Sequence, residues 1–592
     1  MTKTTTITPA KIKQKCPTIG YKVAMDKPSS HLFEITLDVQ EWSDDLLDLK
    51  LPVWTPGSYL IREYARHVQS FDAYSTENRE KLFSQKISKN HWQIQTDNVT
   101  NITIKYQIFA NELTVRTNHL DQTHGYFNGA ALFYFIPGLE KQPITIEIIP
   151  PNPQWKVSTS LPQNTSKVNT FTAIDYDTLV DSPFEIGTHH IYDFEVLNKP
   201  HKLAIWGQGN IKPEKVIRDT KKIIETEAQL YGELPYDNYL FILHLCNNGF
   251  GGLEHKSSCS LIYSQFGFRA KDKYNRFLQL VAHEFFHLWN VKRIRPKALE
   301  TFDYERENYT HSLWFLEGTT SYYDMIIPLR AGIYQATDFL DLLSKEITRY
   351  LNTPGRKIHP LSESSFDAWI KLYRRDANSD NSQISYYLKG ELVSLLLDLL
   401  IRSRHSNQRS LDDIMRQMWK KFGRPEIGFT PQQLQETIES VAEINLEDFF
   451  RRYLDTTEEL PFNHYLELFG LQLQPVMESE VIPYLGLRVQ SDNGKEIIKF
   501  VEAESPAALA GIDPNDELLA IDGIRVNAEQ LPERLKDYQS GDMMTITVFH
   551  QDQLKTISLK LTDPQPNRYQ VMRIENPSKI QQENFIGWLG QN

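Results

Sequence analysis

The sequence predicts a multidomain α+β protein, with strands in its first part, mostly helices in its middle part and a small mixed module at its end. The chain has 592 residues, enough for three or four domains. Apolar residues recur at every second position in the first part and at helical spacing in the middle. The pattern changes again near residue 460. We therefore predict domains at residues 1–180, 181–460 and 461–592.

Alternating apolar and polar residues indicate the strands of the first domain. Residues 31–39, 101–108 and 144–149 alternate with a period of two, as half-buried strands do. Turn residues separate these runs at short intervals, so we expect an antiparallel sandwich. Residues 51–66, LPVWTPGSYLIREYAR, show no clean period. We interpret them as an ordered, packed loop, with the wall of a binding cleft as the alternative.

The middle domain begins with a mixed pattern and then becomes helical. Apolar runs at residues 202–206 and 240–245 predict buried strands, and the amphipathic spacing of Pro213–Tyr231 predicts a helix. Further helices are expected over residues 339–351, 385–401 and 411–422, and a final pair of helices over 430–453. Thr430 serves as N-cap of this pair and Pro431 as its first helical residue.

A single apolar helix in this domain contains an H-E-x-x-H sequence, His283-Glu284-Phe285-Phe286-His287. Residues four apart share one face of a helix, so both imidazoles can reach one metal ion. Glu284 lies about 100° around the helix, where it can contact a metal-bound water without ligating the metal. This pattern is typical of zinc metalloproteases. The alternative is a pair of core histidines on a buried helix.

A catalytic zinc site needs a third protein ligand and one open position. We predict that Glu317 supplies this ligand, because it is the one carboxylate in the largely apolar segment 313–323. Glu305 and Glu307 are the rivals. They lie in a charged run, 303–308, that is more typical of a loop. His255 and His311 are conceivable fourth ligands, which would close the site and make the zinc structural.

Two further groups are candidates for substrate contacts. Glycines in the segment 248–255 allow a close approach of the backbone, and Glu254 directly after them can present a carboxylate at the mouth of the site. A glycine turn with a solvated glutamate is the alternative. The helix at 385–401 opens with Tyr386 and Tyr387. A tyrosine beside the metal can donate its O–H to an oxyanion, whereas a core tyrosine would be structural.

Composition excludes several other classes of protein. The net charge is −12, which argues against nucleic-acid binding. The three cysteines, Cys16, Cys246 and Cys259, form no C-x-x-C pair and no disulfide framework, as expected in a reducing compartment. Residues Met1–Thr6 contain no apolar leader core, and no apolar run is long enough to span a membrane. We therefore expect a cytoplasmic protein without a membrane partner.

The last domain has the pattern of a small α/β module. Strands are expected at residues 484–487, 497–501, 516–523, 544–549 and 554–561, and helices at 505–511 and 528–538. Ser505, Pro506 and Gly511 have the residue types of an N-cap, a first helical position and a C-terminal stop. Asp522-Gly523 is typical of a tight turn that closes a strand pair.

These groups of residues together resemble the glycyl aminopeptidase family of PDZ-bearing zinc metallopeptidases. The resemblance rests on VWTPGSY at 53–59, H-E-F-F-H at 283–287, FDYEREN at 302–308, LEG at 316–318 and a final module that looks like a PDZ domain. It implies an N-terminal β domain, a thermolysin-like catalytic domain with a helical subdomain, and a C-terminal PDZ domain. It also implies removal of small residues, such as glycine or alanine, from peptides with free N-termini.

A wider resemblance is to zinc aminopeptidases with a G-x-M-E-N motif, which Gly251-Gly252-Leu253-Glu254-His255 matches with Leu for Met and His for Asn. It implies that Gly251 and Gly252 line the substrate and that Glu254 binds its α-amino group. Tyr387, before Lys389-Gly390, matches the tyrosine that stabilises the tetrahedral intermediate in those enzymes. The segment 293–308 looks like an insertion before Glu317.

We therefore predict a zinc aminopeptidase with one zinc per chain, bound by His283, His287 and Glu317, with Glu284 as general base and Tyr387 as oxyanion donor. The alternatives are a zinc endopeptidase or oligopeptidase, and a non-catalytic peptide-binding adaptor. In the PDZ-like module, Leu485, Gly486 and Leu487 would bind the carboxylate of a peptide C-terminus. Alternatively, the module packs on the catalytic domain as structure.

Overall fold

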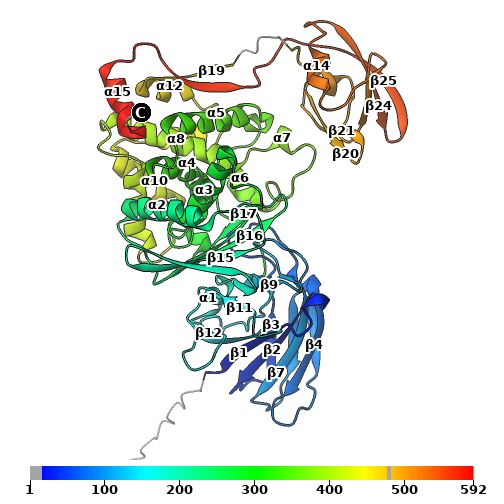
Figure 1. Cartoon of the computed structure of the whole chain (residues 1–592), viewed down its shortest axis with the longest axis vertical. Helices are drawn as coiled ribbons and strands as arrows, with labels where there is room; N and C mark the ends of the chain where they lie inside the picture. The colour runs from blue at the N-terminus through cyan, green and yellow to red at the C-terminus, as the bar shows by residue number, and fades with distance from the viewer. Residues whose placement is uncertain (1–15, 477–481, 591–592) are drawn as a thin grey trace, which may run out of the picture. The chain divides into compact units, whose positions relative to one another are not determined.

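The computed structural model describes residues 16–476 and 482–590 (Figure 1). The leader expectation drawn from Met1–Thr6 therefore lies outside the described residues. The chain forms two compact units, which are described separately. The β unit comprises Met1–Ile211, Tyr236–Phe266 and Asp303–Glu307, and the helical unit comprises Lys212–Pro235, Gly267–Phe302 and Asn308–Asn592. The predicted domain borders stay predictions.

The β unit opens with a six-stranded sheet built from the alternating segments. Its order is β12 (Thr170–Ala173), β10 (Ile144–Ile149), β1 (Thr18–Ala24), β2 (Leu32–Gln40), β7 (Ile102–Phe109) and β4 (Val68–Ser75). The predicted antiparallel arrangement holds for the other pairs of this sheet, and β1 and β10 form its one parallel pair. The long excursion of the chain between these two strands allows β10 to return in the same direction as β1.

Two smaller sheets complete the N-terminal part of the β unit. One has three strands in the order β3 (Leu46–Lys50), β6 (His91–Gln95) and β5 (Ser84–Ser88). The other has four, in the order β11 (Lys156–Ser158), β13 (Phe184–Gly187), β9 (His124–Phe127) and β8 (His119–Leu120). A short helix, α1 (Tyr176–Val180), has Asp175 as N-cap.

A five-stranded mixed sheet forms the rest of the β unit. Its order is β14 (His190–Val196), β15 (Lys199–Trp206), β16 (Tyr239–Cys246), β18 (Ser258–Ser264) and β17 (Phe250–Glu254). Strand β16 is buried over nearly its whole length and is parallel to both neighbours, which explains its continuous apolar run. The glycine segment, for which a turn was the alternative interpretation, forms the edge strand β17, antiparallel to β18.

The helical unit is built from amphipathic and wholly apolar helices, as predicted. Its longer helices are α2 (Pro213–Tyr231), α3 (Lys271–Phe286), α4 (Thr319–Arg330), α5 (Ala336–Leu351), α8 (Tyr386–Arg404), α9 (Leu411–Met418), α10 (Pro431–Ala442) and α11 (Glu447–Tyr453). Helix α8 is buried along most of its length. It packs against α4 and against the turn that precedes α4. Thr430 and Gln433 form a capping box at the start of α10.

The PDZ-like module is a sheet with its own apolar core. Its strands are β20 (Leu487–Asp492), β21 (Lys495–Val501), β22 (Glu517–Ile521), β23 (Ile524–Arg525), β24 (Met543–His550) and β25 (Gln553–Lys560). Ser505 caps α13 (Pro506–Leu509), as predicted. Helix α14 covers only Leu531–Leu535, so the predicted helix at 528–538 is too long. Asn527 and Gln530 form local side-chain bonds to each other's backbone N–H groups, which favours a turn before the helix.

The segments on either side of the module return to the helical unit. Strands β19 (Leu471–Pro475) and β26 (Tyr569–Arg573) pair with each other. The N–H of Val571 donates to Ser344 Oγ on α5 at 2.9 Å. The last helix, α15 (Lys579–Leu589), contacts α8 and the turn at Glu467–Phe469.

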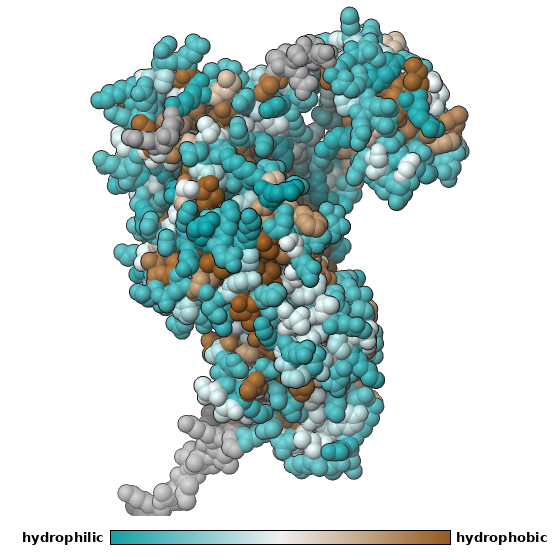
Figure 2. Space-filling view, in the orientation of Figure 1, coloured by the Kyte–Doolittle hydropathy of each residue, from teal (hydrophilic) through white to brown (hydrophobic). Residues whose placement is uncertain are grey.

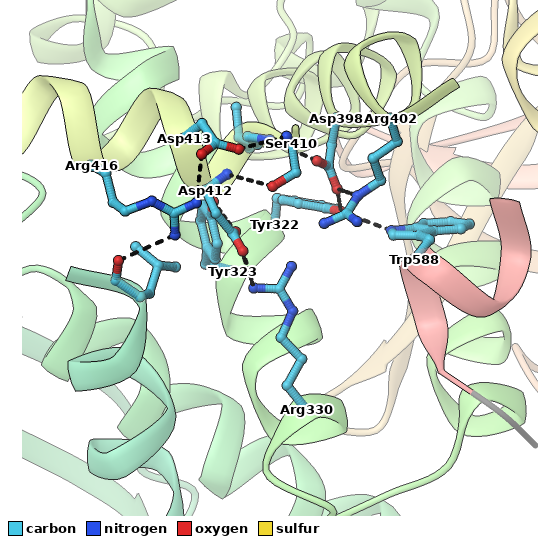
Figure 3. Close-up of polar contacts among 12 residues, drawn as sticks. Tyr322, Tyr323, Arg330, Asp398, Arg402, Ser410, Asp412, Asp413, Arg416 and Trp588 are labelled. Atoms are coloured by element: carbon cyan, nitrogen blue, oxygen red, sulfur yellow. Dashed lines mark hydrogen bonds and ion pairs between the residues drawn. The ribbon is translucent and has the colours of Figure 1, made fainter. Parts of the chain in front are cut away.

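Buried charges hold α4, α8 and α15 together (Figure 3). Asp398 accepts hydrogen bonds from Tyr322 OH at 2.5 Å and from Arg402 Nε at 2.8 Å. Trp588 of α15 donates its indole N–H to Tyr322 OH at 3.0 Å. Asp398, Arg402 and Trp588 are almost fully buried, so each polar group needs these partners.

On the face drawn in Figure 2, hydrophobic side chains lie mostly among hydrophilic ones. No helix in the described part of the chain is both long and apolar enough to cross a membrane.

Candidate metal centre and active site

Helix α3 of the helical unit carries the H-E-x-x-H residues. The helix ends at Phe286, and His287 keeps helical dihedral angles (φ −61°, ψ −19°) as its C-cap. His283 and His287 therefore stay on one face of the helix. Their ring centroids are 4.6 Å apart and the ring planes are nearly perpendicular at 87°. Glu284, between them in sequence, is buried.

Glu317 completes a three-residue cluster with these histidines. It lies in a π-helical turn, Trp314–Gly318, that leads into α4, and it is buried. Its Oε2 atom is 3.5 Å from His283 Nε2 and 3.1 Å from His287 Nε2. The rival Glu305 belongs to the β unit, where it forms an ion pair with Lys50 at 2.8 Å.

The outward-facing ring nitrogens of the two histidines are fixed by other groups. His283 Nδ1 lies 2.8 Å from Asp324 Oδ2 of α4. His287 Nδ1 donates to the backbone carbonyl of Asn290 at 2.7 Å. Both contacts leave the Nε2 atoms directed at Glu317, as in metal sites whose histidines are oriented by a second hydrogen bond.

Asn290 is a positioning residue that the sequence reasoning missed. Its side-chain amide donates to the backbone carbonyls of Phe315 and Leu316 at 3.0 and 3.1 Å. These are the two residues that precede Glu317, while the carbonyl of Asn290 itself orients His287. Asn290 therefore couples the end of α3 to the turn that presents Glu317. A polar residue three positions after His287 in an apolar segment is the signal that could have revealed it.

The three donors fit a zinc ion. Two imidazole nitrogens and one carboxylate form the His₂Glu set of catalytic zinc sites, and the donor atoms lie within 4.8 Å of one another. Burial alone would raise the pKa of Glu317, but the adjacent imidazoles of His287 and His283 outweigh it and lower the pKa to about 2. Glu317 is thus a carboxylate that is ionised at neutral pH, as a metal ligand must be.

Tyr387, at the start of α8, lies next to His283. The two rings are stacked at 6.3 Å with an angle of 25°. Burial, and then the charge of Glu317, raise the pKa of Tyr387 well above its usual value, so it stays a protonated hydrogen-bond donor at neutral pH. Tyr386 packs behind it at 4.8 Å and is fully buried. Of the two tyrosines, Tyr387 is therefore the one beside the metal-binding histidines.

Two glycines bring the Glu317 turn and α8 into backbone contact. A Cβ on Gly318 would lie 2.5 Å from the Cα of Gly390, and a Cβ on Gly390 would lie 2.6 Å from the carbonyl oxygen of Trp314. No side chain fits at either position without moving the backbone. This contact sets the turn that carries Glu317 against the helix that carries Tyr387.

Glu254 lies in the β unit at the end of the edge strand β17. It is buried, and its Oε1 atom has no hydrogen-bond partner among the described residues. The 51–59 loop packs on it. Gly57 has φ +86°, and a Cβ there would lie 2.5 Å from Glu254 Oε1. Gly251 and Gly252 lie on the same strand, and Arg116 donates to the carbonyl of Gly252 at 3.1 Å.

The histidines considered as fourth ligands have other contacts. His311 Nδ1 lies 3.3 Å from the carbonyl oxygen of Ser362, and its ring stacks on Phe366 at 4.7 Å. His255, in the β unit, contacts Asp181 through Nδ1 at 3.2 Å. Neither belongs to a described cluster of metal-ligand side chains. The candidate metal centre therefore has three described protein ligands, as catalytic zinc sites do.

The three PDZ-like residues lie where the chain enters β20. Leu485 is buried, Leu487 is the first residue of the strand, and Gly486 between them has φ +82°. Because a side chain at Gly486 would collide with Ser505, only glycine suits this left-handed position.

Three family models match the chain. They are the M61 peptidase N-terminal domain over residues 20–188, the M61 glycyl aminopeptidase over 276–393 and the PDZ domain over 483–561. A crystal structure of an aminopeptidase N family protein from Idiomarina loihiensis is 32% identical, covers 97% of this chain and 100% of its own, and superposes with a TM-score of 0.91. The chain belongs to the M61 glycyl aminopeptidase family. This M61 member is a metallopeptidase with a PDZ domain.

More distant structures resemble this M61 peptidase weakly. An M1 zinc metallopeptidase from Deinococcus radiodurans is 11% identical, covers 76% of this chain and 96% of its own, and has a TM-score of 0.46. Legionella pneumophila aminopeptidase A in complex with aspartic acid is 13% identical, covers 81% and 55%, and also has a TM-score of 0.46. These scores are too low to carry an argument about function. A comparison with curated proteins gives no match.

Proposed function

We propose that this M61 peptidase is a zinc aminopeptidase that removes small N-terminal residues, glycine and alanine, from peptides with a free amino group. The convergence of His283 Nε2 and His287 Nε2 on Glu317 Oε2, at 3.5 and 3.1 Å, carries the proposal. Membership of the glycyl aminopeptidase family supports the preference for small residues.

Glu284 is the proposed general base. It adjoins His283 in the sequence and is buried next to the metal-binding residues. A zinc ion held by His283, His287 and Glu317 would supply Lewis-acid chemistry, lowering the pKa of a water molecule and polarising the substrate carbonyl. Glu284 accepts the proton of the attacking water and returns it to the leaving amine. Tyr387 donates its O–H to the carbonyl oxygen as negative charge develops, a contribution worth roughly 10²–10³ in rate for a single donor elsewhere.

Glu254 is the proposed anchor for the substrate's α-ammonium group. An ionised carboxylate buried without a hydrogen-bond donor is costly, and Glu254 Oε1 has none in the described structure. A substrate ammonium would supply both the charge and the donors. Binding of the amine would select the first peptide bond and so make the enzyme an exopeptidase. Gly251 and Gly252, without side chains on this edge strand, would leave its backbone accessible to the substrate.

The test compares the hydrolysis of Gly- and Ala-p-nitroanilide with that of their N-acetylated forms, with and without a zinc chelator. We expect chelator-sensitive cleavage of the free-amine substrates only. Equal cleavage of blocked substrates would replace the aminopeptidase with the endopeptidase alternative. Glu254→Ala should raise KM for the free-amine substrates, whereas the endopeptidase alternative predicts little change.

We also propose that the PDZ domain binds a peptide C-terminus at Leu485, Gly486 and Leu487. In PDZ domains a peptide adds as a strand beside such a segment, and its carboxylate binds backbone N–H groups. The left-handed backbone of Gly486, with φ +82°, supports this proposal, because left-handed residues occur in the backbone nests that bind anions. Titration of the protein with C-terminal peptide libraries and with their amidated forms tests it, and binding should require the free carboxylate.

A further inference from the structure

A second group of metal-ligand side chains lies in the β unit, outside every motif used above. Ligand atoms of His124, Glu185 and His244 lie within 4.8 Å of one another, and His189 Nδ1 lies 3.9 Å from Glu185 Oε1. These four residues are here called the buried histidine cluster. His124 begins β9, Glu185 lies on the adjacent strand β13, and His189 follows β13. His244 comes from β16 of the five-stranded sheet. The cluster therefore joins two sheets of the same unit.

Strand register brings the first two residues together. Gly187 pairs with His124, and Glu185 pairs with Tyr126. Glu185 is thus the diagonal neighbour of His124 on one face of the sheet. A Cβ on Gly187 would lie 2.7 Å from the Cβ of His124, so the glycine makes room for the imidazole.

The carboxylate of Glu185 contacts three imidazoles. His124 Nδ1 is 2.9 Å from Oε1, His244 Nε2 is 2.8 Å from Oε2, and His189 Nδ1 is 3.9 Å from Oε1. All four side chains have 0% exposure. The bonds of a tetrahedral zinc site are about 2.0–2.1 Å long, so neighbouring ligand atoms lie about 3.3 Å apart. The distances from Glu185 to His124 and His244 are shorter than this value, and the distance to His189 is longer.

One ring nitrogen of His189 has a hydrogen-bond partner and the other has none among the described residues. Its Nε2 atom bonds to Ser158 Oγ at 2.8 Å, which fixes the ring with Nδ1 toward Glu185. Nδ1 is buried and has no hydrogen-bond partner among the described residues. A buried ring nitrogen without a partner costs free energy, and a metal ion would supply one.

The donor set of the cluster suits a divalent cation. Imidazole nitrogens and a buried carboxylate oxygen are ligands that borderline ions such as zinc accept.

We propose that the buried histidine cluster binds a second zinc ion, with His124 Nδ1, His189 Nδ1, His244 Nε2 and the Glu185 carboxylate as ligands. Four protein ligands in a fully buried position make a closed, structural site rather than a catalytic one. The ion would clamp the β9–β13 sheet to β16. The stacking of Trp206 on His124, at 3.7 Å and 13°, holds this ligand in place from a third strand, β15.

A neighbouring group, His119 and Asp121, shares His124 but is less suited to this ion. Asp121 Oδ1 already accepts the N–H groups of Thr123 and His124 at 2.7 and 3.1 Å, and Asp121 is one-third exposed. Its carboxylate is therefore used to close the loop before β9.

The competing explanation is a hydrogen-bonded His–Glu–His group without metal. The two explanations differ at His189. Its Nδ1 atom binds the metal in the zinc site and makes no bond in the metal-free group. The full-length double variant His283→Ala/His287→Ala removes the catalytic metal site and leaves the cluster intact. Equilibrium dialysis against micromolar Zn²⁺, followed by elemental analysis, should find two zinc ions in the wild type and one in the double variant.

Further variants in the double-variant background locate the remaining ion. Adding His189→Ala or His244→Ala should weaken zinc binding at least tenfold. Adding His359→Ala, which truncates a similarly buried histidine of the helical unit, should leave zinc binding unchanged. If a variant fails to fold, Co²⁺ titration of the unsubstituted chain remains, and it should show two equivalents with tetrahedral d–d absorption. A double variant that retains no zinc, or one whose zinc is insensitive to His189→Ala and His244→Ala, would overturn the proposal.

Discussion

At the scale of single residues, the candidate metal centre depends on groups that touch its ligands rather than on the ligands alone. His283 and His287 need their Nδ1 atoms fixed by Asp324 and by the carbonyl of Asn290 before both Nε2 atoms can face Glu317. The H-E-x-x-H sequence indicates which residues bind the metal. The surrounding hydrogen bonds determine how the imidazoles are oriented.

Asn290→Ala should weaken zinc binding without removing a ligand. The substitution deletes the amide that holds the carbonyls of Phe315 and Leu316, so the Glu317 turn loses its link to α3. Loss of such outer contacts costs about 10–100-fold in metal affinity elsewhere. The zinc concentration that restores half of the peptidase activity to chelated protein measures the effect. Asn90→Ala, at a buried asparagine of the β unit, is the control and should leave this concentration unchanged.

Lys389 should make stability depend on alkaline pH. Burial lowers the pKa of Lys389 from 10.5 to about 8, and Glu459 only partly opposes this. The unfolded chain therefore binds more protons than the folded chain between pH 8 and 10.5, and stability rises with pH over this window. From pH 7.5 to 9.5 this residue should add about 2 kcal/mol to the free energy of unfolding.

The measurement is urea unfolding of the wild type and of Lys389→Met at both pH values. The free energy of unfolding of the variant should rise less between the two pH values than that of the wild type. At pH 7.5 the variant should have the larger free energy of unfolding. An equal rise in stability with pH for both proteins would show that Lys389 is not the group responsible.

At the scale of secondary-structure elements, the site is assembled by close contacts between segments that the sequence predicted only as separate helices. The turn that carries Glu317 touches α8 through Gly318 and Gly390, backbone to backbone. The contact is made by two glycines from different segments. The apolar periodicity of a single segment therefore cannot reveal it.

Gly390→Ala should disturb the catalytic geometry more than its single added methyl group suggests. The new Cβ would lie 2.6 Å from the carbonyl oxygen of Trp314, so the turn or the helix must move. A displacement of about 1 Å can cost roughly 100-fold in rate. We expect kcat for Gly-p-nitroanilide to fall by about this factor. Gly20→Ala is the control, because its nearest contact would be an ordinary 3.9 Å, and kcat should not change.

The charged group of Figure 3 should be essential for the packing of α4, α8 and α15. Asp398→Ala leaves Arg402 as a buried charge without its partner. Breaking such a pair by removing one member costs about 3–5 kcal/mol. Asp413→Ala removes a half-buried partner of Arg416 and one member of the capping box at the start of α9. Apart from the loss of this cap, the substitution should lower the free energy of unfolding by under 1 kcal/mol. Thermal unfolding of both variants measures the difference, and similar losses would contradict this account.

At the scale of the whole molecule, local patterns in the sequence were enough to predict the elements and the metal-ligand candidates. Pro213–Tyr231 is the helix α2 with the predicted ends, and the residues of the H-E-x-x-H helix and Glu317 come together. Spacing within one helix indicates α2 and the two histidines, and a lone carboxylate in an apolar segment indicates Glu317. The parallel pairing of β1 with β10 was not predicted, because strand order depends on contacts far apart in the chain.

The same limit explains what the sequence did not reveal about the other functional groups. The sequence indicated Glu254 as a candidate substrate contact, but not that Gly251 and Gly252 belong to an edge strand that Glu254 ends. The buried histidine cluster joins residues from β9, β13 and β16, and their positions in the sequence form no motif. The return of β19, β26 and α15 to the helical unit likewise depends on pairing between the two flanks of the PDZ domain.

The central claim is that the H-E-x-x-H centre catalyses the removal of N-terminal residues. The most direct test is the hydrolysis of Gly-p-nitroanilide by Glu284→Gln, with the zinc content measured on the same sample. Gln keeps the size of the side chain but cannot accept the proton of the attacking water. We predict unchanged zinc content and a rate at least 100-fold lower. A variant that keeps its zinc and the wild-type rate would contradict the account.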